Sequence, residues 1–111
     1  MSHHAALEAR RERAARNQSL FRELNERIEA RSTTASFVEF VCECADQSCD
    51  AKVSLTLEEY EQVRSHPNRF IVLRGHNLVD VETIVVAADG YYVVSKLGVG
   101  GEVARELDPR S

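Results

Sequence analysis

The first third of the chain follows a helical pattern. Residues 1–31 contain neither Gly nor Pro and, from Ala5 onward, are rich in Ala, Leu, Arg and Glu, which favour helix. Apolar side chains recur every seven residues, at Leu7, Ala14, Phe21 and Ile28. Leu20 and Leu24 strengthen this repeat only in the second half. The pattern predicts a long N-terminal helix whose second half packs on the body or on a second copy of the helix, while residues 1–16 project as a basic arm.

Short runs rich in β-branched and aromatic residues follow, and such runs are typical of strands. The predicted strands cover residues 37–42, 51–55, 70–73, 81–87 and 91–96. The first two are expected to form a hairpin, because only the polar segment 43–50 separates them. The last two are expected to form another hairpin across Asp89 and Gly90, a dipeptide that suits a type I′ turn.

Helix signals are weaker in the rest of the chain. Thr56 and Glu59 have the spacing of a capping box, which predicts a helix over residues 57–65. Residues 98–111 contain three Gly and only a short helical stretch, so a weakly ordered tail is expected. The fold class is therefore predicted to be α+β, with a small, mainly antiparallel sheet and one short helix in a body of residues 32–97.

The composition suits one small domain with a thin apolar core. The chain has 111 residues with no Trp, four Phe and three Tyr, and a metal or another cross-link often supplements so small a core. The sequence has no apolar run long enough to span a membrane and no apolar signal region at its N-terminus. We therefore expect a cytoplasmic protein, in a reducing compartment where cysteines bind metal or stay free.

All three cysteines lie within eight residues, in the pattern Cys42-x-Cys44-x4-Cys49. Three thiols this close together can converge on one cation, and zinc accepts thiolate and imidazole ligands in a tetrahedron. His76 is the best candidate for the fourth ligand, because Gly75 precedes it in a loop directly after a predicted strand. The alternative fourth ligands are His66, Asp46 and Asp50. The sequence thus predicts a zinc site.

Other interpretations of this cluster stay open. Four protein ligands would close the metal's coordination shell, so no enzymatic activity is predicted. A reversible disulfide between two of the thiols would instead make a redox sensor that releases the metal. In the simplest alternative, Cys42 is a buried residue that ends a strand, Cys44 and Cys49 are exposed thiols, and His76 bonds a backbone carbonyl.

Charge is distributed unevenly along the chain. Residues 1–31 carry seven Arg against five Glu, whereas residues 32–111 carry seven basic against thirteen acidic side chains. An acidic body argues against broad nucleic-acid affinity, which needs a concentrated basic face. The candidates for a nucleic-acid contact are Arg10, Arg11, Arg13 and Arg16. Because Glu residues alternate with Arg at three- and four-residue spacings, an exposed helix without any partner is favoured.

Several segments together carry a resemblance. An Arg- and Glu-rich opening helix is followed by Phe-Val-Cys-Glu-Cys with Cys49, then by Leu-Thr-Leu-Glu-Glu-Tyr and later by Arg-Gly-His. In this combination the chain resembles a family of small uncharacterised actinobacterial proteins, over most of its length but not after Gly98. The resemblance implies a recurring small domain with a cysteine cluster and no assigned activity. Its motif positions are Cys42, Cys44, Cys49 and His76.

These features predict a zinc-stabilised, non-enzymatic interaction module that binds a protein partner or forms a homodimer through its first helix. The first alternative is a nucleic-acid or transcription-associated accessory protein that uses the four arginines. The second alternative is a thiol redox sensor. No contact with a membrane is expected.

Overall fold

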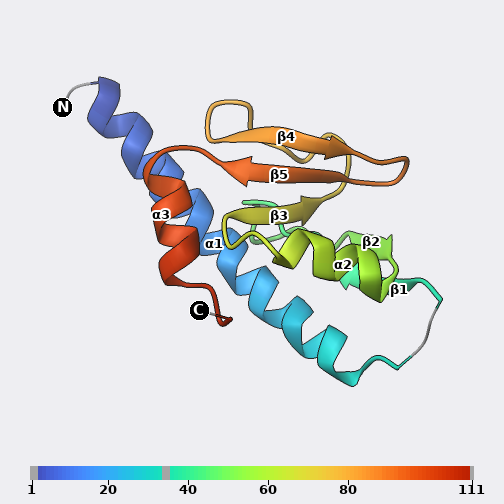
Figure 1. The fold of residues 1–111 in the computed structure, drawn as a ribbon. Coiled ribbons are helices and arrows are strands. Elements are labelled where there is room, and N and C mark those ends of the chain that lie inside the picture. Colours follow the sequence, from blue (N-terminus) through green and yellow to red (C-terminus); the bar gives the residue numbers. More distant parts are fainter. Residues whose placement is uncertain (1–2, 34–35, 111) are drawn as a thin grey trace.

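The computed structural model describes residues 3–33 and 36–110, with side chains from residue 5 onward. Its elements in chain order are α1 (His3–Arg31), β1 (Val38–Val41), β2 (Lys52–Leu55), α2 (Leu57–Arg64), β3 (Arg69–Val72), β4 (Glu82–Ala87), β5 (Tyr92–Lys96) and α3 (Val99–Glu106) (Figure 1). The predicted α+β class is confirmed. Residues 1–2, 34–35 and 111, which belong to the predicted arm, body and tail, lie outside the described residues. None of the helices in the described ranges is long and apolar enough to cross a bilayer.

The strands divide into two small antiparallel sheets, and both predicted hairpins are confirmed. β1 pairs with β2, with Val38 opposite Leu55. The second sheet has the strand order β3-β5-β4, so that β5 lies in the middle. The predicted type I′ turn is wrong, because such a turn needs positive φ at both central residues and neither Asp89 nor Gly90 has one.

Helix α2 begins at the predicted capping box and covers the apolar core. The backbone N–H of Glu59 donates to the Thr56 hydroxyl at 3.1 Å, and the Thr56 N–H donates to the Glu59 carboxylate at 2.8 Å. Tyr60, one turn later, is fully buried and stacks on Phe40 of β1, with 4.4 Å between the ring centroids. The core therefore lies where α2 meets β1, β2 and the β3–β5 pair.

The buried face of α1 follows the apolar repeat only in part. Ala14 is buried and Ile28 packs against the core, but Leu20 and Leu24 are 61% and 41% exposed, and most of the side chains that face the body are small or polar. The buried residues of α1 are Ala14, Ala15, Gln18, Ser19, Arg22 and Asn25. The predicted packing of the leucines on the body is therefore wrong. Main-chain groups of the body need hydrogen-bond partners, which apolar side chains cannot provide.

Arg22 shows how this polar face works. Its guanidinium donates to the carbonyls of Pro67 and Ala104, the second at 2.7 Å, and it lies 4.6 Å from the centroid of the Phe70 ring. One side chain of α1 thus contacts α3, β3 and the turn that precedes β3. A charged group so deeply buried is tolerated because carbonyl oxygens and an aromatic face replace its water.

Helix α3 and its contact with α1 contradict two predictions, the projecting arm and the weakly ordered tail. It lies against α1 (Figure 1), and the two helices approach so closely at Gly100 that an added Cβ would lie 3.0 Å from the Arg11 carbonyl oxygen. The prediction of a projecting arm is therefore wrong for residues 11–16, and the prediction of a weakly ordered tail is wrong for residues 99–108. Glycine, which lowers helix propensity in isolation, here permits contact between two helices.

The end of the chain is held by ion pairs to α1 and α2. Arg110 donates to Glu26 and Glu29 of α1 at 3.0 and 3.1 Å, and to Glu61 of α2 at 2.6 Å. Burial, and then the neighbouring Glu61 carboxyl, raise the pKa of Glu29 to about 7. Hydrogen bonds from Arg110 and from Glu29 lower the pKa of Glu61 to about 2. The pair therefore takes up its first proton near neutral pH, well above the ordinary range of a carboxyl group.

We expect Glu29 to make the domain less stable as pH rises from about 5 to about 7.5. Its folded pKa of about 7 lies above its ordinary value of 4.5, so the folded state binds more protons than the unfolded state in this window. Urea unfolding of the wild type and of Glu29→Gln across the window measures the effect. The variant should show a smaller loss of unfolding free energy with pH. Equal slopes for the two proteins would contradict the assignment.

Candidate metal centre

The three cysteines and one histidine come from two loops that the fold brings together. Cys42 follows β1 directly, and Cys44 and Cys49 lie in the connection to β2. His76 lies in the loop after β3, where Gly75 has a φ of 89° that glycine adopts readily. Cys42 and Cys44 are 1% and 2% exposed, and Cys49 is half-buried. The sequence adjacency of the cysteines and the pairing of the strands thus produce one compact cluster.

The cluster is small enough for one metal ion to contact all four residues. One atom from each of the four residues lies within 4.8 Å of the others. His76 Nδ1 lies 3.6 Å from Cys42 Sγ and 3.6 Å from Cys49 Sγ. A zinc ion at about 2.3 Å from sulfur and about 2.0–2.1 Å from nitrogen places those two atoms about 3.6 Å apart. The four side chains therefore lie close enough together to bind a metal ion.

Hydrogen bonds alone do not account for this convergence. A ring nitrogen carries either one proton or one lone pair, so Nδ1 of His76 cannot form full hydrogen bonds with two sulfurs at once. Both sulfurs nevertheless lie at the same distance from it. Equal spacing around a common centre is the arrangement that a shared cation would need.

The other candidate ligands, Asp46, Asp50 and His66, do not belong to the cluster. Asp46 accepts hydrogen bonds from the N–H and hydroxyl of Ser48 at 2.9 and 2.6 Å, which stabilises the turn before Cys49. Asp50 is exposed, and His66 is an exposed residue that bonds Ser65. Among the described residues, only His76 joins the three cysteines in a group with metal-binding dimensions.

Backbone groups support the cluster. The N–H of Leu73 donates to Cys42 Sγ at 3.2 Å, and the N–H of His76 donates to the carbonyl of Leu73 at 2.9 Å. A donor aimed at sulfur stabilises a thiolate, and second-layer bonds of this kind orient metal ligands. Leu73, which directly follows β3, thus holds both the sulfur of Cys42 and the loop that carries His76.

The thiols need a cation before they can act as ligands together. Burial, together with repulsion by the other two sulfurs, raises the pKa of the Cys42 thiol to about 12, although the N–H of Leu73 opposes this effect. Burial also raises the pKa of Cys44. Three thiolates side by side are therefore unfavourable at neutral pH unless a positive ion lies among them. Metal binding would release the thiol protons.

Amide side chains of α1 hold the backbone of the cysteine segment. Asn25 exchanges two hydrogen bonds with the main chain of Val41, at 2.8 and 2.9 Å. Gln18 donates to the carbonyl of Glu43 at 2.8 Å, and Asn17 donates to that of Ala45 at 3.3 Å. The amides thus bond the carbonyls of every second residue, Val41, Glu43 and Ala45, as a neighbouring β-strand would. These contacts were not predicted from the sequence, in which amides seven and eight residues apart on a helix were the available signal.

Glu43, between the first two cysteines, belongs to the same support. It is buried, and its two carboxylate oxygens accept from the N–H of Ile71 at 2.9 Å and from Asn25 at 2.8 Å. The N–H of Glu43 in turn donates to the Ile71 carbonyl at 2.8 Å. These bonds join the end of β1 to β3. Burial raises the pKa of Glu43 to about 7.

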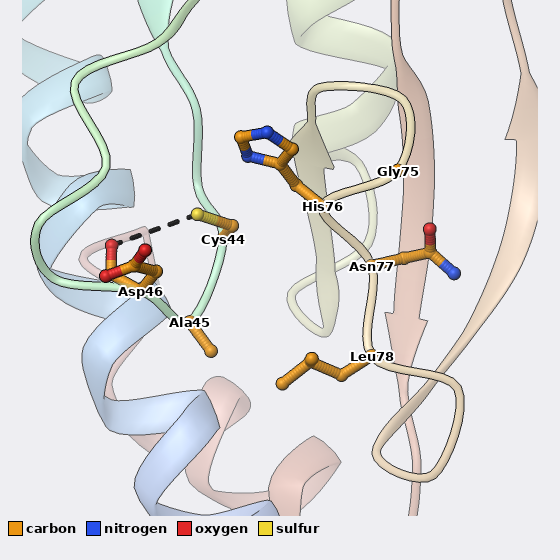
Figure 2. Close-up of a pocket in the computed structure, with 7 residues that line it drawn as sticks. All are labelled: Cys44, Ala45, Asp46, Gly75, His76, Asn77 and Leu78. Carbon is orange, nitrogen blue, oxygen red and sulfur yellow. Dashed lines mark hydrogen bonds between the residues drawn. The ribbon is translucent and has the colours of Figure 1, made fainter.

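A shallow depression of about 430 Å³ opens beside the cluster. Figure 2 shows Cys44 and Asp46 on one side of it and the loop with His76, Asn77 and Leu78 on the other. The Cys44 thiol also lies 3.9 Å from the Asp46 carbonyl oxygen. The depression thus borders the cluster at Cys44 and at the half-buried His76, whereas Cys42 lies in the core.

The four candidate arginines do not gather on one face. Arg10 forms an ion pair with Asp80, and Arg11 donates to the Asp80 carbonyl at 3.2 Å. Arg16 pairs with Glu12 on the surface at 3.0 Å, and Arg13 is exposed. The first two arginines thus help to fix the loop before β4 against α1.

The chain was also compared with known proteins. No protein-family model, curated protein or solved structure matches it. The resemblance to an actinobacterial family stays a prediction, and the function is inferred from the site itself.

Proposed function

We propose that the protein is a non-enzymatic interaction module stabilised by one zinc ion, which Cys42, Cys44, Cys49 and His76 bind. The observation that carries the proposal is the pair of 3.6 Å distances from His76 Nδ1 to two cysteine sulfurs. Three soft thiolates and one imidazole in a tetrahedral arrangement favour zinc over hard cations such as Mg²⁺ or Ca²⁺, which take oxygen ligands.

A structural role fits this site better than a catalytic one. Catalytic zinc ions keep one position open for water or substrate, whereas four protein ligands fill the shell. The nearby acids do not serve as a general base, because Glu43 bonds the main chain of β3 and Asp46 bonds Ser48. Zinc would instead fasten the β1–β2 hairpin to the loop after β3, and so connect the two sheets.

Metal analysis of protein purified without affinity metals tests this proposal. We expect close to one zinc per chain in the wild type. In His76→Ala, zinc affinity should fall by more than about 100-fold, because even outer-layer partners of a metal site cost about 10–100-fold when removed. Competition with a chromophoric chelator measures the affinity.

His66→Ala is the matched control, because His66 is an exposed histidine outside the cluster. Its zinc content and affinity should equal those of the wild type. The proposal would be wrong if the wild type binds no zinc, or if the two histidine variants bind it equally well.

A further inference from the structure

One side of α1 faces away from both sheets (Figure 1) and carries an unusual combination of side chains. Residues three and four apart lie on the same side of a helix. The residues of this side, here called the outer stripe, are Arg13, Arg16, Leu20, Glu23, Leu24, Arg27 and Arg31. All seven are exposed. The stripe thus has two leucines at its centre and arginines at both ends.

The outer stripe is basic although the whole chain has a net charge of −4. It holds four Arg and one Glu. Arg16 pairs with Glu12, but its side chain remains 54% exposed, and surface pairs of this kind are weak. The two leucines are among the most exposed large apolar residues of the described chain. Two residues of the stripe, Glu23 and Arg27, also line a depression of about 330 Å³ together with Glu26 and Pro109.

A second copy of the same helix is a poor occupant for this stripe. If Leu20 lay opposite Leu24 of an antiparallel copy, Arg13 would lie opposite Arg31 of that copy. Centring Leu20 on Leu20 would set Arg13 against Arg27 instead, and a parallel copy would set each arginine near its own equivalent. These three arrangements bring like charges together, which is unfavourable. Centring Leu24 on Leu24 of an antiparallel copy avoids this, but it sets Arg27 opposite Phe21 and Arg31 opposite Asn17, so no acidic side chain would meet an arginine.

We infer that the outer stripe is a docking site for an acidic amphipathic helix of a protein partner. Acidic side chains would meet Arg13, Arg27 and their neighbours, and apolar side chains would cover Leu20 and Leu24. Nucleic acid is the poorer fit, because phosphates gain nothing from two central leucines. The inference rests on the proposed role as an interaction module, but it does not depend on the metal.

The test uses a synthetic helical peptide of about 18 residues as its probe, with leucines on one side and glutamates flanking them. We expect it to bind the full-length wild-type protein with a Kd below about 100 μM at low salt, and more weakly at high salt. A glutamate peptide of equal charge without leucines, and a short DNA duplex, should each bind at least about tenfold more weakly. Isothermal calorimetry or fluorescence anisotropy measures all three.

Two double variants locate the contact. Leu20→Ala with Leu24→Ala, and Arg13→Gln with Arg27→Gln, should each weaken peptide binding about tenfold or more. Val79→Ala with Arg105→Gln is the matched control, because both residues are exposed outside α1, and it should bind as the wild type does. Circular dichroism confirms that each variant is folded.

Three results would overturn the inference: no binding of the amphipathic peptide, equal binding of DNA, or undiminished binding by both stripe variants. Zinc content is measured on the same samples. A protein that holds one zinc but ignores the peptide would reject the docking site alone. A protein that binds the peptide without zinc would reject the metal site alone.

Discussion

Cys49→Ser should abolish the cooperative thermal unfolding of the domain. Serine is close to cysteine in size and Cys49 is only half-buried, so the substitution removes one of the four proposed zinc ligands with little loss of packing. Small structural zinc sites contribute about 10–16 kcal/mol of binding free energy. That is as large as the whole folding free energy of a typical domain, about 5–15 kcal/mol. Circular dichroism during heating measures the transition.

Removing the metal with a chelator should have the same effect as Cys49→Ser. Wild-type protein stripped of metal should unfold like Cys49→Ser, and added zinc should restore the wild type but not the variant. Asp46→Asn is the matched control, because Asp46 lies in the same connection but outside the cluster, and it should keep both zinc and the transition. A metal-free wild type that still unfolds sharply at an unchanged temperature would show that the cluster does not stabilise the fold.

Lys96→Met should lower the unfolding free energy by about 3–5 kcal/mol, because it leaves a buried carboxylate without its cation. The side chains of Lys96 and Glu82 are 0% and 1% exposed, and Lys96 Nζ lies 2.9 Å from Glu82 Oε1. Burial lowers the pKa of Lys96, and the nearby Glu82 carboxylate opposes that effect. Urea unfolding measures the change.

A second substitution separates lost charge from lost packing. Glu82 accepts from Gln18 with one oxygen and from the Leu78 N–H with the other. Adding Glu82→Gln to Lys96→Met removes the unpaired charge and keeps one of these two acceptors, so the double variant should regain about half of the loss. Lys52→Met, at an exposed position of β2, should change stability by less than about 0.5 kcal/mol. If the double variant were no more stable than Lys96→Met, packing would account for the loss.

Local signals in the sequence were sufficient for most elements. The long helix, the two hairpins and the capping box at Thr56 depend on neighbours within a few residues, and each is present. The cysteine cluster was also predictable, because Cys42, Cys44 and Cys49 lie on one short connection. His76 was a preference among several candidates, and only the return of the chain after β3 brings it to the sulfurs.

Helix α1 shows where sequence patterns misled. Leu20 and Leu24 have the spacing of a buried stripe, yet they face outward, because the opposite side carries amides and Arg22 that bond open main-chain groups. Such partners become visible only when the strands are in place. The glycines near residue 100 likewise indicate disorder in isolation, but they allow α3 to approach the backbone of Arg11.

The amino-acid sequence by itself determined most of the elements and the three-thiol segment, because helix propensity, capping and hairpin pairing act over short distances. Tertiary structure alone decided which face of α1 is buried, which histidine joins the cysteines and how the last residues pack. Those choices depend on contacts between residues tens of positions apart. The free energy of these contacts comes from hydrogen bonds to buried polar groups. The spacing of apolar residues along the sequence does not reveal those bonds.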